Sequence, residues 1–298
     1  MKAPAVVSGG LLLLTALSLS ACPWNAAGDT GCTPTDVALP LPSELTESSG
    51  VAWSLAQPGV LWSHNDGGDE PLLYALDFKG HLLARIPLEG VRNRDWEDMA
   101  TAPCDAGFCI YLADTGDNYA RWSEILLHRI VDTGSLEETP RKVETFTMLL
   151  PDGARDIEAL FVLPGEDIRL VTKGRHAGNV VYRYPPPLRS GETVLLEEVQ
   201  TLSEGSMPIP EQITGADASP DGSLVVLRTY QDMTFYRVED GQLIPLEGGK
   251  VSLGTLQEPQ GEGIAFGPDL QVVLTTEAGN FGGIAALRVL HCPALPGG

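Results

Sequence analysis

Basic residues are scarce in this sequence. It carries 19 Lys and Arg against 40 Asp and Glu, so its formal net charge is −21 at pH 7. A protein that binds nucleic acid or an anionic membrane surface needs a basic patch, and this composition argues against both partners. The excess of acid favours cations as ligands, or it serves solubility alone.

The sequence also lacks the short motifs of the common catalytic sites. It contains no GxSxG elbow, no HExxH motif, no P-loop and no GxGxxG loop. Neither a CxxC nor an HxxxH spacing is present, which makes zinc a poor candidate. Any catalysis must therefore use another arrangement of residues.

Long hydrophobic runs are absent except at the N-terminus. There Lys2 is followed by the apolar run LLLLTALSL and then by LSAC, which ends at Cys22. This is an export signal, too short for a membrane span. LSAC resembles a bacterial lipobox, and an ordinary signal peptide with a chance cysteine is the alternative. We expect a signal peptide at residues 1–21 and a lipidated linker at 22–32.

The expected lipid on Cys22 makes the bilayer a partner of the protein and places it in the cell envelope. Residue 23 is Pro and not Asp, so in a double-membrane bacterium the outer membrane is the default. Removal of the leader also removes Lys2, so the mature chain is more negative by one charge. Whether the protein faces the periplasm or the exterior is left open by the sequence.

Four cysteines remain besides Cys22, and an even number in an exported chain predicts two disulfides. Cys104 and Cys109 bound the short loop CDAGFC, which can close on itself. Cys32 is then left to pair with Cys292 across nearly the whole chain.

A repeated pattern of short β-strands fills residues 33–298. One motif occurs five times, as SGVAWS, EDMATA, EALFVL, TGADAS and EGIAFG. A second and a third strand follow each copy, and a fourth follows the first four copies; we place the last of these at VSLGTLQ, residues 251–257. Four antiparallel strands recurring about every fifty residues are typical of β-propeller blades. We therefore predict an all-β propeller with five blades rather than six.

The fifth repeat ends after its third strand, and residues 33–42 can supply the fourth from the other end of the chain. The ring would then close by mixing N- and C-terminal strands in one blade. A Cys32–Cys292 disulfide would link those neighbouring strands.

Propeller geometry predicts that acidic residues from distant repeats meet at one mouth of the central channel, because first strands begin and second strands end on the same face. Many carboxylates close together require a counter-cation or raised pKa values, and hard oxygen ligands at this density suit Ca²⁺. The predicted metal ligands are Asp66, Asp95, Glu97, Asp98, Asp114, Asp117, Asn118, Asp156, Glu158, Glu262 and Glu277.

Ordinary turn chemistry is the alternative reading, because Asp, Asn and Gly favour turns. It explains poorly why Glu97, Glu158 and Glu262 occupy one position of the repeat, since Glu has no special turn propensity. Lys173, Arg175 and Arg228 lie where other repeats carry acids. They either neutralise those acids or hold an anionic substrate group. His64, beside this mouth, is a candidate acid or base and is more often a polar turn residue.

The segments DIEAL (156–160) and QGEGIAF (260–266), with the acidic mouth, resemble calcium-dependent β-propeller phytases, which hydrolyse phosphate esters. The resemblance implies that Glu158 and Glu262 bridge catalytic calcium and that Lys173 contacts phosphate. That family has six blades, whereas five repeats are visible here. DWEDMA with LADTGDN, and ITGADASPDGSLVVLRTY, are more similar to a family of uncharacterised exported bacterial propellers, which implies the fold alone.

The sequence thus predicts a calcium-binding exported propeller with phosphoesterase or related hydrolase activity. A metal-activated water would attack the ester, with no protein nucleophile. The alternative is a non-catalytic propeller that binds a protein, an anionic small molecule or another envelope component, with calcium only rigidifying its loops. Fold alone does not name the substrate.

Overall fold

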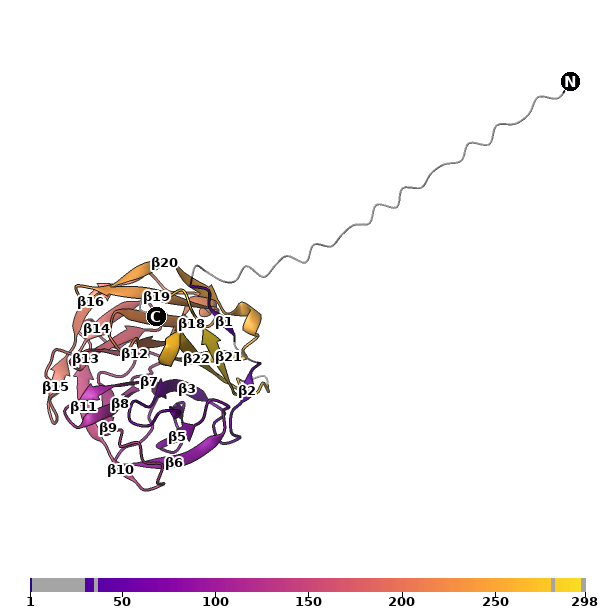
Figure 1. Ribbon diagram of the computed structural model, residues 1–298. Helices are drawn as coiled ribbons and strands as arrows, with labels where there is room; N and C mark the ends of the chain where they lie inside the picture. The colour runs from indigo at the N-terminus through magenta and orange to yellow at the C-terminus, as the bar shows by residue number, and fades with distance from the viewer. Residues whose placement is uncertain (2–29, 35–36, 280–281, 296–298) are drawn as a thin grey trace.

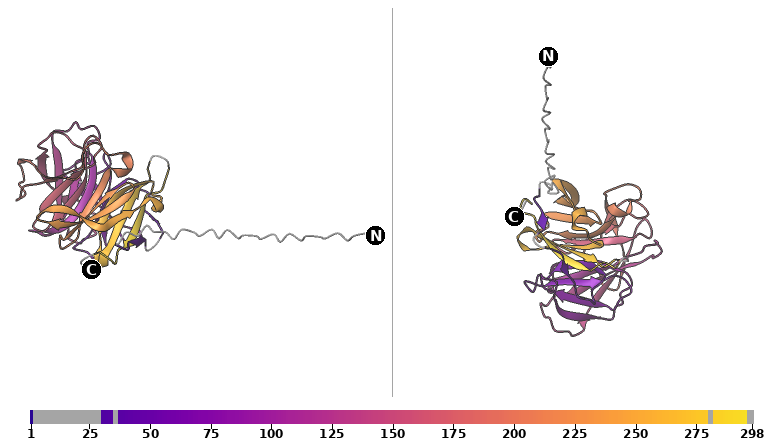
Figure 2. Two further views of the ribbon diagram at one scale, coloured as in Figure 1. Left: turned by 90° about the horizontal axis from the view of Figure 1, so that it is seen from above. Right: turned by 90° about the vertical axis from the view of Figure 1, so that its right-hand side faces the viewer.

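Five mainly antiparallel sheets are arranged in a ring in the computed structural model of the chain (Figure 1). The structure describes residues 1, 30–34, 37–279 and 282–295, so the predicted leader and Cys22 lie outside the described residues. The two side views in Figure 2 show the strands crossing the thickness of the ring. The chain is a five-bladed β-propeller, and the predicted fold class is confirmed.

Blades 1 and 2 each gain a fifth, short strand. Blade 1 contains β3 (Ser48–Trp53), β4 (Leu61–Asn65), β5 (Leu72–Leu76), β6 (Leu82–Glu89) and β10 (Arg141–Lys142). Blade 2 contains β7 (Trp96–Cys104), β8 (Gly107–Asp114), β9 (Ile125–Val131), β11 (Glu144–Leu149) and β15 (Thr193–Leu195). Both β10 and β15 come from the following blade and pair in parallel with the outermost strand, so they cover sheet edges that would otherwise be exposed.

Blades 3 and 4 have four strands each. Blade 3 contains β12 (Ile157–Leu163), β13 (Asp167–Thr172), β14 (Val180–Arg183) and β16 (Glu197–Thr201). Blade 4 contains β17 (Ile213–Ala218), β18 (Leu224–Thr229), β19 (Asp232–Glu239) and β20 (Gln242–Ser252). The last strand of blade 4 was expected at 251–257. It lies earlier, because β19 and β20 are joined by a tight turn at Asp240 and Gly241, and 254–256 form a 3₁₀ helix.

Blade 5 combines the two ends of the chain, as predicted. It contains β21 (Gln260–Phe266), β22 (Gln271–Glu277), β23 (Ala286–His291), β1 (Thr33–Pro34) and β2 (Leu39–Pro40). Both N-terminal strands pair antiparallel with β23. The ring closes where β3 lies beside β21, seen in Figure 1 as indigo next to yellow.

The two predicted disulfides are confirmed. Cys32 is bonded to Cys292 next to the pairing of β1 with β23, and Cys104 to Cys109 across the hairpin of β7 and β8. The first of these links residues 260 positions apart in the sequence.

The first and second strands of the blades are mostly buried, because a blade packs against a neighbour on each face. The apolar side chains form clusters between blades, for example Tyr111, Phe146 and Tyr182 between blades 2 and 3. The rest of the described chain has three one-turn 3₁₀ helices, at Ile209–Glu211, Gly254–Leu256 and Pro268–Leu270. No helix among the described residues is long and apolar enough to span a membrane.

Candidate functional site

A β-bulge occurs at the start of the first strand in all five blades. In each blade the register with the second strand shifts there, and one extra residue stands on the first strand. Glu97, Glu158 and Glu262 lie within these bulges, and Ser49 and Thr214 occupy the equivalent place in the other two blades. A bulge re-aims a side chain out of the regular alternation of a strand. The repeated glutamate position is thus a bulge position at the acidic mouth.

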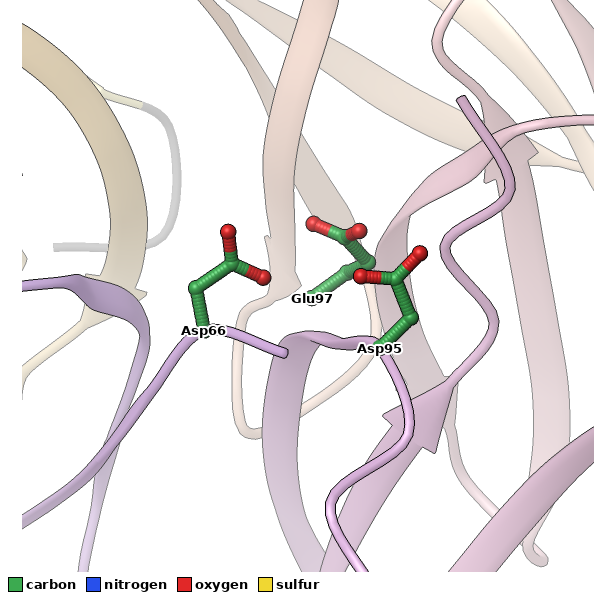
Figure 3. Close-up of side chains that lie close together, drawn as sticks. All are labelled: Asp66, Asp95 and Glu97. Carbon is green, nitrogen blue, oxygen red and sulfur yellow. The ribbon is translucent and has the colours of Figure 1, made fainter. Parts of the chain in front are cut away.

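Three carboxylates from two segments of the chain converge at this mouth. Asp66 follows β4, Asp95 precedes β7, and Glu97 lies in the bulge of β7. One oxygen of each lies within 4.8 Å of the others, and Figure 3 shows the three groups facing a common space. We call Asp66, Asp95 and Glu97 the first acidic group.

Two glycines allow the chain to pack closely around this group. A Cβ atom on Gly116 would lie 1.9 Å from Oε1 of Glu97, and one on Gly67 would lie 2.4 Å from Oδ1 of Asp95. Neither position accepts a side chain without displacing a carboxylate. The backbone carbonyl of Asp95 also accepts hydrogen bonds from the N–H groups of Thr115 and Gly116, which fixes the loop.

Glu97 also belongs to a second acidic group, with Asp156 and Glu158. Their oxygens again lie within 4.8 Å of one another, and all three residues are buried. Here a protein cation is already present, because Nζ of Lys173 lies 2.7 Å from Oε2 of Glu158. Oε1 of Glu158 is buried and accepts no hydrogen bond from the described part of the chain.

Besides these two groups, Glu262 and Glu277 form a pair of acids in blade 5, joined by Gln260. The amide Nε2 of Gln260 donates to Oε1 of Glu262 at 3.0 Å and to Oε2 of Glu277 at 2.7 Å. Oε2 of Glu262 is buried without a hydrogen-bond donor among the described residues. Glu262 and Glu158 thus each present one unpaired oxygen.

Burial and mutual repulsion raise the pKa values of Asp95, Glu97 and Glu277. Burial, followed by the charges of Asp66 and Asp156, raises the pKa of Asp95 to about 6. Burial and the charge of Glu262 raise the pKa of Glu277 to about 9, and burial and Glu158 raise the pKa of Glu97 well above its usual value. Burial alone would lower the pKa of Lys173, but the surrounding glutamates outweigh it and raise that pKa. Protons and a bound cation would therefore compete for these carboxylates.

Three predicted ligands have their carboxylates occupied by other groups. Asp98 accepts hydrogen bonds from the backbone N–H groups of Met99, Leu160 and Ala216, and Asp117 accepts from those of Arg121 and Trp122. Asp114 accepts from the N–H of Asp95 and lies 3.5 Å from Nε2 of His128. These three acids support the fold around the mouth and are not members of either acidic group.

Asn118 and Asp156 have further partners. Asn118 is exposed, and its backbone carbonyl contacts Nε2 of His176 at 2.9 Å. Oδ1 of Asp156 accepts the N–H of Asp117 at 2.9 Å, and its Oδ2 lies 3.2 Å from Nε of Arg175.

The three predicted anion-binding residues differ in their surroundings. Arg228 is fully buried, where it donates to the carbonyls of Gly263 and Thr275 and pairs with Glu258 at 2.6 Å. It joins blades 4 and 5 and lies out of reach of a substrate in this structure. Lys173 is buried and forms an ion pair with Glu158. Arg175 is the one residue of the three that is partly exposed, with 36% of its side chain accessible.

His64, the predicted acid or base, is fully buried. Its Nδ1 contacts the carbonyl of Asn65 at 2.9 Å, its Nε2 lies near Gly50, and its ring meets Trp96 edge to face. Burial lowers the pKa of His64 to about 4. It lies below the mouth rather than in it, as a packed neutral side chain.

Two residues at the mouth had no role in the sequence prediction. Gln260 connects Glu262 with Glu277, and the ring of Tyr230 lies 5.8 Å from Nζ of Lys173. Gln260 stands in the segment QGEGIAF, but nothing in that segment shows that its amide reaches two strands. Tyr230 follows β18 at the position equivalent to Asp66, so the repeat alignment could have located it.

Comparisons with known proteins support the fold. No protein-family model matches the chain, and no curated protein matches its sequence. The chain is similar in structure to the PQQ-bound aldose sugar dehydrogenase of Streptomyces coelicolor, with a TM-score of 0.52 and 12% identity over 87% of this chain and 97% of that one. A gluconolactonase of Xanthomonas campestris gives a TM-score of 0.46 and 11% identity over 88% and 97% of the two chains.

A virginiamycin B lyase of Staphylococcus aureus gives a TM-score of 0.42 and 13% identity over 87% of this chain and 74% of that one. At 12% identity, the likeness to the sugar dehydrogenase supports a β-propeller and no particular activity. The resemblance to calcium-dependent phytases stays a prediction.

Proposed function

We propose that the acidic mouth binds calcium and that the bound cation supports hydrolysis of a phosphate ester or a related anionic ester. The observation that carries the proposal is the first acidic group, whose oxygens lie within 4.8 Å of one another. Oxygens that share one Ca²⁺ lie up to about 5 Å apart, because each Ca–O distance is about 2.3–2.6 Å. Asp66, Asp95 and Glu97 form no ion pair with a Lys or Arg in the described chain, so their charge is left for an added cation.

The second acidic group supports a further cation next to the first. Glu97 is common to both groups, so its carboxylate could bridge two ions, as in enzymes with paired metals. The second position is conditional on Lys173, whose Nζ must leave Oε2 of Glu158 or share that carboxylate. Binding at the first group is therefore expected to be the tighter of the two.

The proposed chemistry assigns a limited part to the protein. A bound cation supplies positive charge that polarises an ester oxygen and acidifies water. Arg175, the partly open basic residue of the mouth, would bind the anionic part of the substrate. The high pKa of Glu277 places a proton-bearing carboxyl group near Glu262, where it could donate to a leaving group.

A non-catalytic propeller is the second candidate, and the burial of Arg228 favours it. With Arg228 enclosed and Lys173 paired, Arg175 is the one predicted anion-binding residue with solvent access. The mouth would then recognise a protein or envelope component, and calcium would serve to rigidify the loops that carry Asp66, Asp95 and Gly116.

Calorimetry and a turnover assay distinguish these candidates. The chelator-treated mature protein is titrated with Ca²⁺ and then assayed on a panel of phosphate monoesters and diesters, with and without calcium. Saturable binding together with calcium-dependent turnover that falls in Arg175→Ala supports the hydrolase. Saturable binding with no turnover supports the binding propeller, and no heat at millimolar calcium refutes both forms of the proposal.

We also propose that Cys22 is lipidated and anchors the protein in the cell envelope, with the bilayer and an anionic envelope component as partners. The support comes from the sequence alone, in which LSAC follows an apolar run. These residues lie outside the described part of the chain. Mass spectrometry of the purified protein tests this. We expect a diacylglyceryl modification on Cys22 and release of Cys22→Ser into the soluble fraction; an unmodified Cys22 would refute it.

A further inference from the structure

A cavity opens at the opposite end of the first strands from the acidic mouth. Its volume is about 520 Å³, and all five blades contribute to its wall. The contributing segments are the ends of β3, β7, β12, β17 and β21 and the turns that follow four of them. Since the acids stand at the beginnings of the same strands, the cavity and the acidic groups lie at opposite ends of the first strands.

The wall of this cavity is mainly apolar and is held in place by the fold. Trp53, Phe108 and Phe266 line it, together with several prolines of the turns. The ring of Trp53 is fixed by Phe78, with centroids 4.3 Å apart, and by Gly267, where a Cβ would lie 2.8 Å from the indole. Concave apolar sites of this volume, with few polar groups, are typical of small-molecule binding.

Asp217 is the one ionisable residue that lines the cavity in the part of the chain that the structure describes, and no basic residue does so there. Oδ1 of Asp217 accepts the N–H of Ala218, and Oδ2 accepts that of Phe266, both at 2.8 Å. These bonds fix the carboxylate. Each oxygen of a carboxylate can accept more than one hydrogen bond, so acceptor positions remain.

The charge of Asp217 lacks a protein counter-ion. No Lys or Arg within the described chain pairs with it, and burial raises its pKa to about 7. A carboxylate in an apolar wall gains most from a ligand that brings a positive charge, because the low polarity of the surroundings strengthens the attraction. Aromatic faces such as Trp53 and Phe266 also favour a cation placed near them.

We propose that this cavity binds a small organic amine whose apolar body packs against Trp53, Phe108 and Phe266 and whose ammonium group donates to Asp217. The apolar wall accounts for the body of such a ligand, and the single fixed carboxylate accounts for its charge. A neutral ligand would leave Asp217 uncompensated, and an anionic one would be repelled by it. This site is independent of the calcium site at the other mouth.

Three matched probes test the proposal with the mature chain carrying Cys22→Ser, which alters no described residue. They are 2-(1-naphthyl)ethylamine, the neutral 2-(1-naphthyl)ethanol and the anionic 1-naphthylacetate, followed by their fluorescence. We expect saturable binding of one amine per chain, at least tenfold tighter than the alcohol and tighter still than the carboxylate. Equal affinity for amine and alcohol, or no amine binding at millimolar concentration, would overturn the proposal.

Variants assign the effect to the cavity. Asp217→Asn is expected to remove the preference for the amine while keeping the affinity for the alcohol, and Ala218→Trp, which fills the cavity, is expected to abolish both. Asp221→Asn is the control, because Asp221 is exposed on the same turn and does not line the cavity.

If Asp217→Asn does not fold, two other results test the proposal. These are the ratio of the affinities for the amine and the alcohol in the unsubstituted protein, and the loss of binding in Ala218→Trp. A preference that survives in folded Asp217→Asn contradicts the assignment. If the parent is a dimer and Ala218→Trp is a monomer, a second copy of the chain occupies the cavity. That result also overturns the proposal.

Discussion

Glu97 and Asp98 are neighbours in β7, and their carboxylates have opposite surroundings. Glu97 lies within 4.8 Å of acidic oxygens from two other segments, whereas Asp98 accepts backbone N–H groups from the first strands of blades 2, 3 and 4. The bulge in β7 makes this possible, because it inserts an extra residue and turns consecutive side chains to different places. One residue serves the candidate site and the next holds the ring together.

Removal of the Glu97 charge should weaken calcium binding. We expect Glu97→Gln to lower the calcium affinity at least tenfold, about 1.4 kcal/mol, because Glu97 is common to both acidic groups. Calorimetric titration measures it. Asp69→Asn removes an exposed acid from the loop that carries Asp66 and should change the affinity little. Equal effects in the two variants would mean that general acidity, not a ligand set, attracts the ion.

Removal of the Asp98 carboxylate should destabilise the ring. Asp98→Ala leaves three buried N–H groups without their acceptor, and we expect a loss of at least about 2 kcal/mol in the free energy of unfolding. Urea denaturation measures this. Asp105→Ala, at an exposed position, is the control and should stay within about 0.5 kcal/mol of the parent. A small effect of Asp98→Ala would show that water replaces the carboxylate.

The Lys173–Glu158 ion pair should couple stability to calcium. Lys173→Met removes one partner of a buried pair, and the remaining carboxylate should cost about 3–5 kcal/mol of stability when calcium is absent. Added calcium should restore more of that stability than it adds to the parent, because the ion can take the place of the ammonium group. Thermal unfolding with calcium or with chelator measures both effects. An equal calcium-induced shift of Tm in the two proteins would argue against a cation beside Glu158.

Asp217 should make stability depend on pH. Its pKa is raised to about 7 by burial, against about 3.9 when unfolded, so the folded chain binds more protons between these values. Protonation of Asp217 therefore contributes to the free energy of unfolding, and this contribution is fully present below pH 4. It is lost as the pH rises towards 7, and the loss is at most about 4 kcal/mol. The other buried carboxylate near it is Asp98, which adds a dependence of the same sign.

The free energy of unfolding of Asp217→Asn should therefore change less than that of the parent when the pH rises from 4 to 7. Urea denaturation at several pH values compares the two proteins, and Asp69→Asn, at an exposed position of blade 1, should behave as the parent does. Parallel curves for Asp217→Asn and the parent would place the pKa of Asp217 in its ordinary range.

The long-range disulfide should stabilise the chain more than the short one. Loop-closure entropy gives about 5.5 kcal/mol for a loop the size of that between Cys32 and Cys292, and about 2 kcal/mol for the loop between Cys104 and Cys109. Paired Cys→Ser variants of each bridge, compared by urea denaturation, measure the difference. Equal losses would mean that the paired strands of blade 5 already restrict the unfolded chain.

The fold could be predicted because the repeat carries it. The five copies of one strand motif, and a fifth repeat that lacks its last strand, determine the number of blades and the place of closure. Blade 4 departs from the prediction because its last strand is the irregular, polar segment QLIPLEGGKVS, in which no strand alternation is visible. The parallel strands β10 and β15 contain two and three residues, too few for any pattern.

The site could be predicted in part. The repeat aligned Glu97, Glu158 and Glu262, but it could not distinguish an acid that faces the mouth from one that accepts backbone N–H groups, as Asp98 does. That difference depends on a bulge, which the sequence does not mark. The burial of Arg228 depends on Glu258 and on two carbonyls from blade 5, and these contacts follow from the packing of blades rather than from sequence spacing.

The closure of blade 5 also has a mechanical consequence. Two-residue strands such as β1 and β2 would peel from β23 under a small force applied along the N-terminal segment. Cys32 immediately precedes β1 and is bonded to Cys292, immediately after β23. Tension from the N-terminus therefore passes through a covalent bond to the far end of the chain before it reaches any strand hydrogen bond, and the ring is protected from unzipping at its seam.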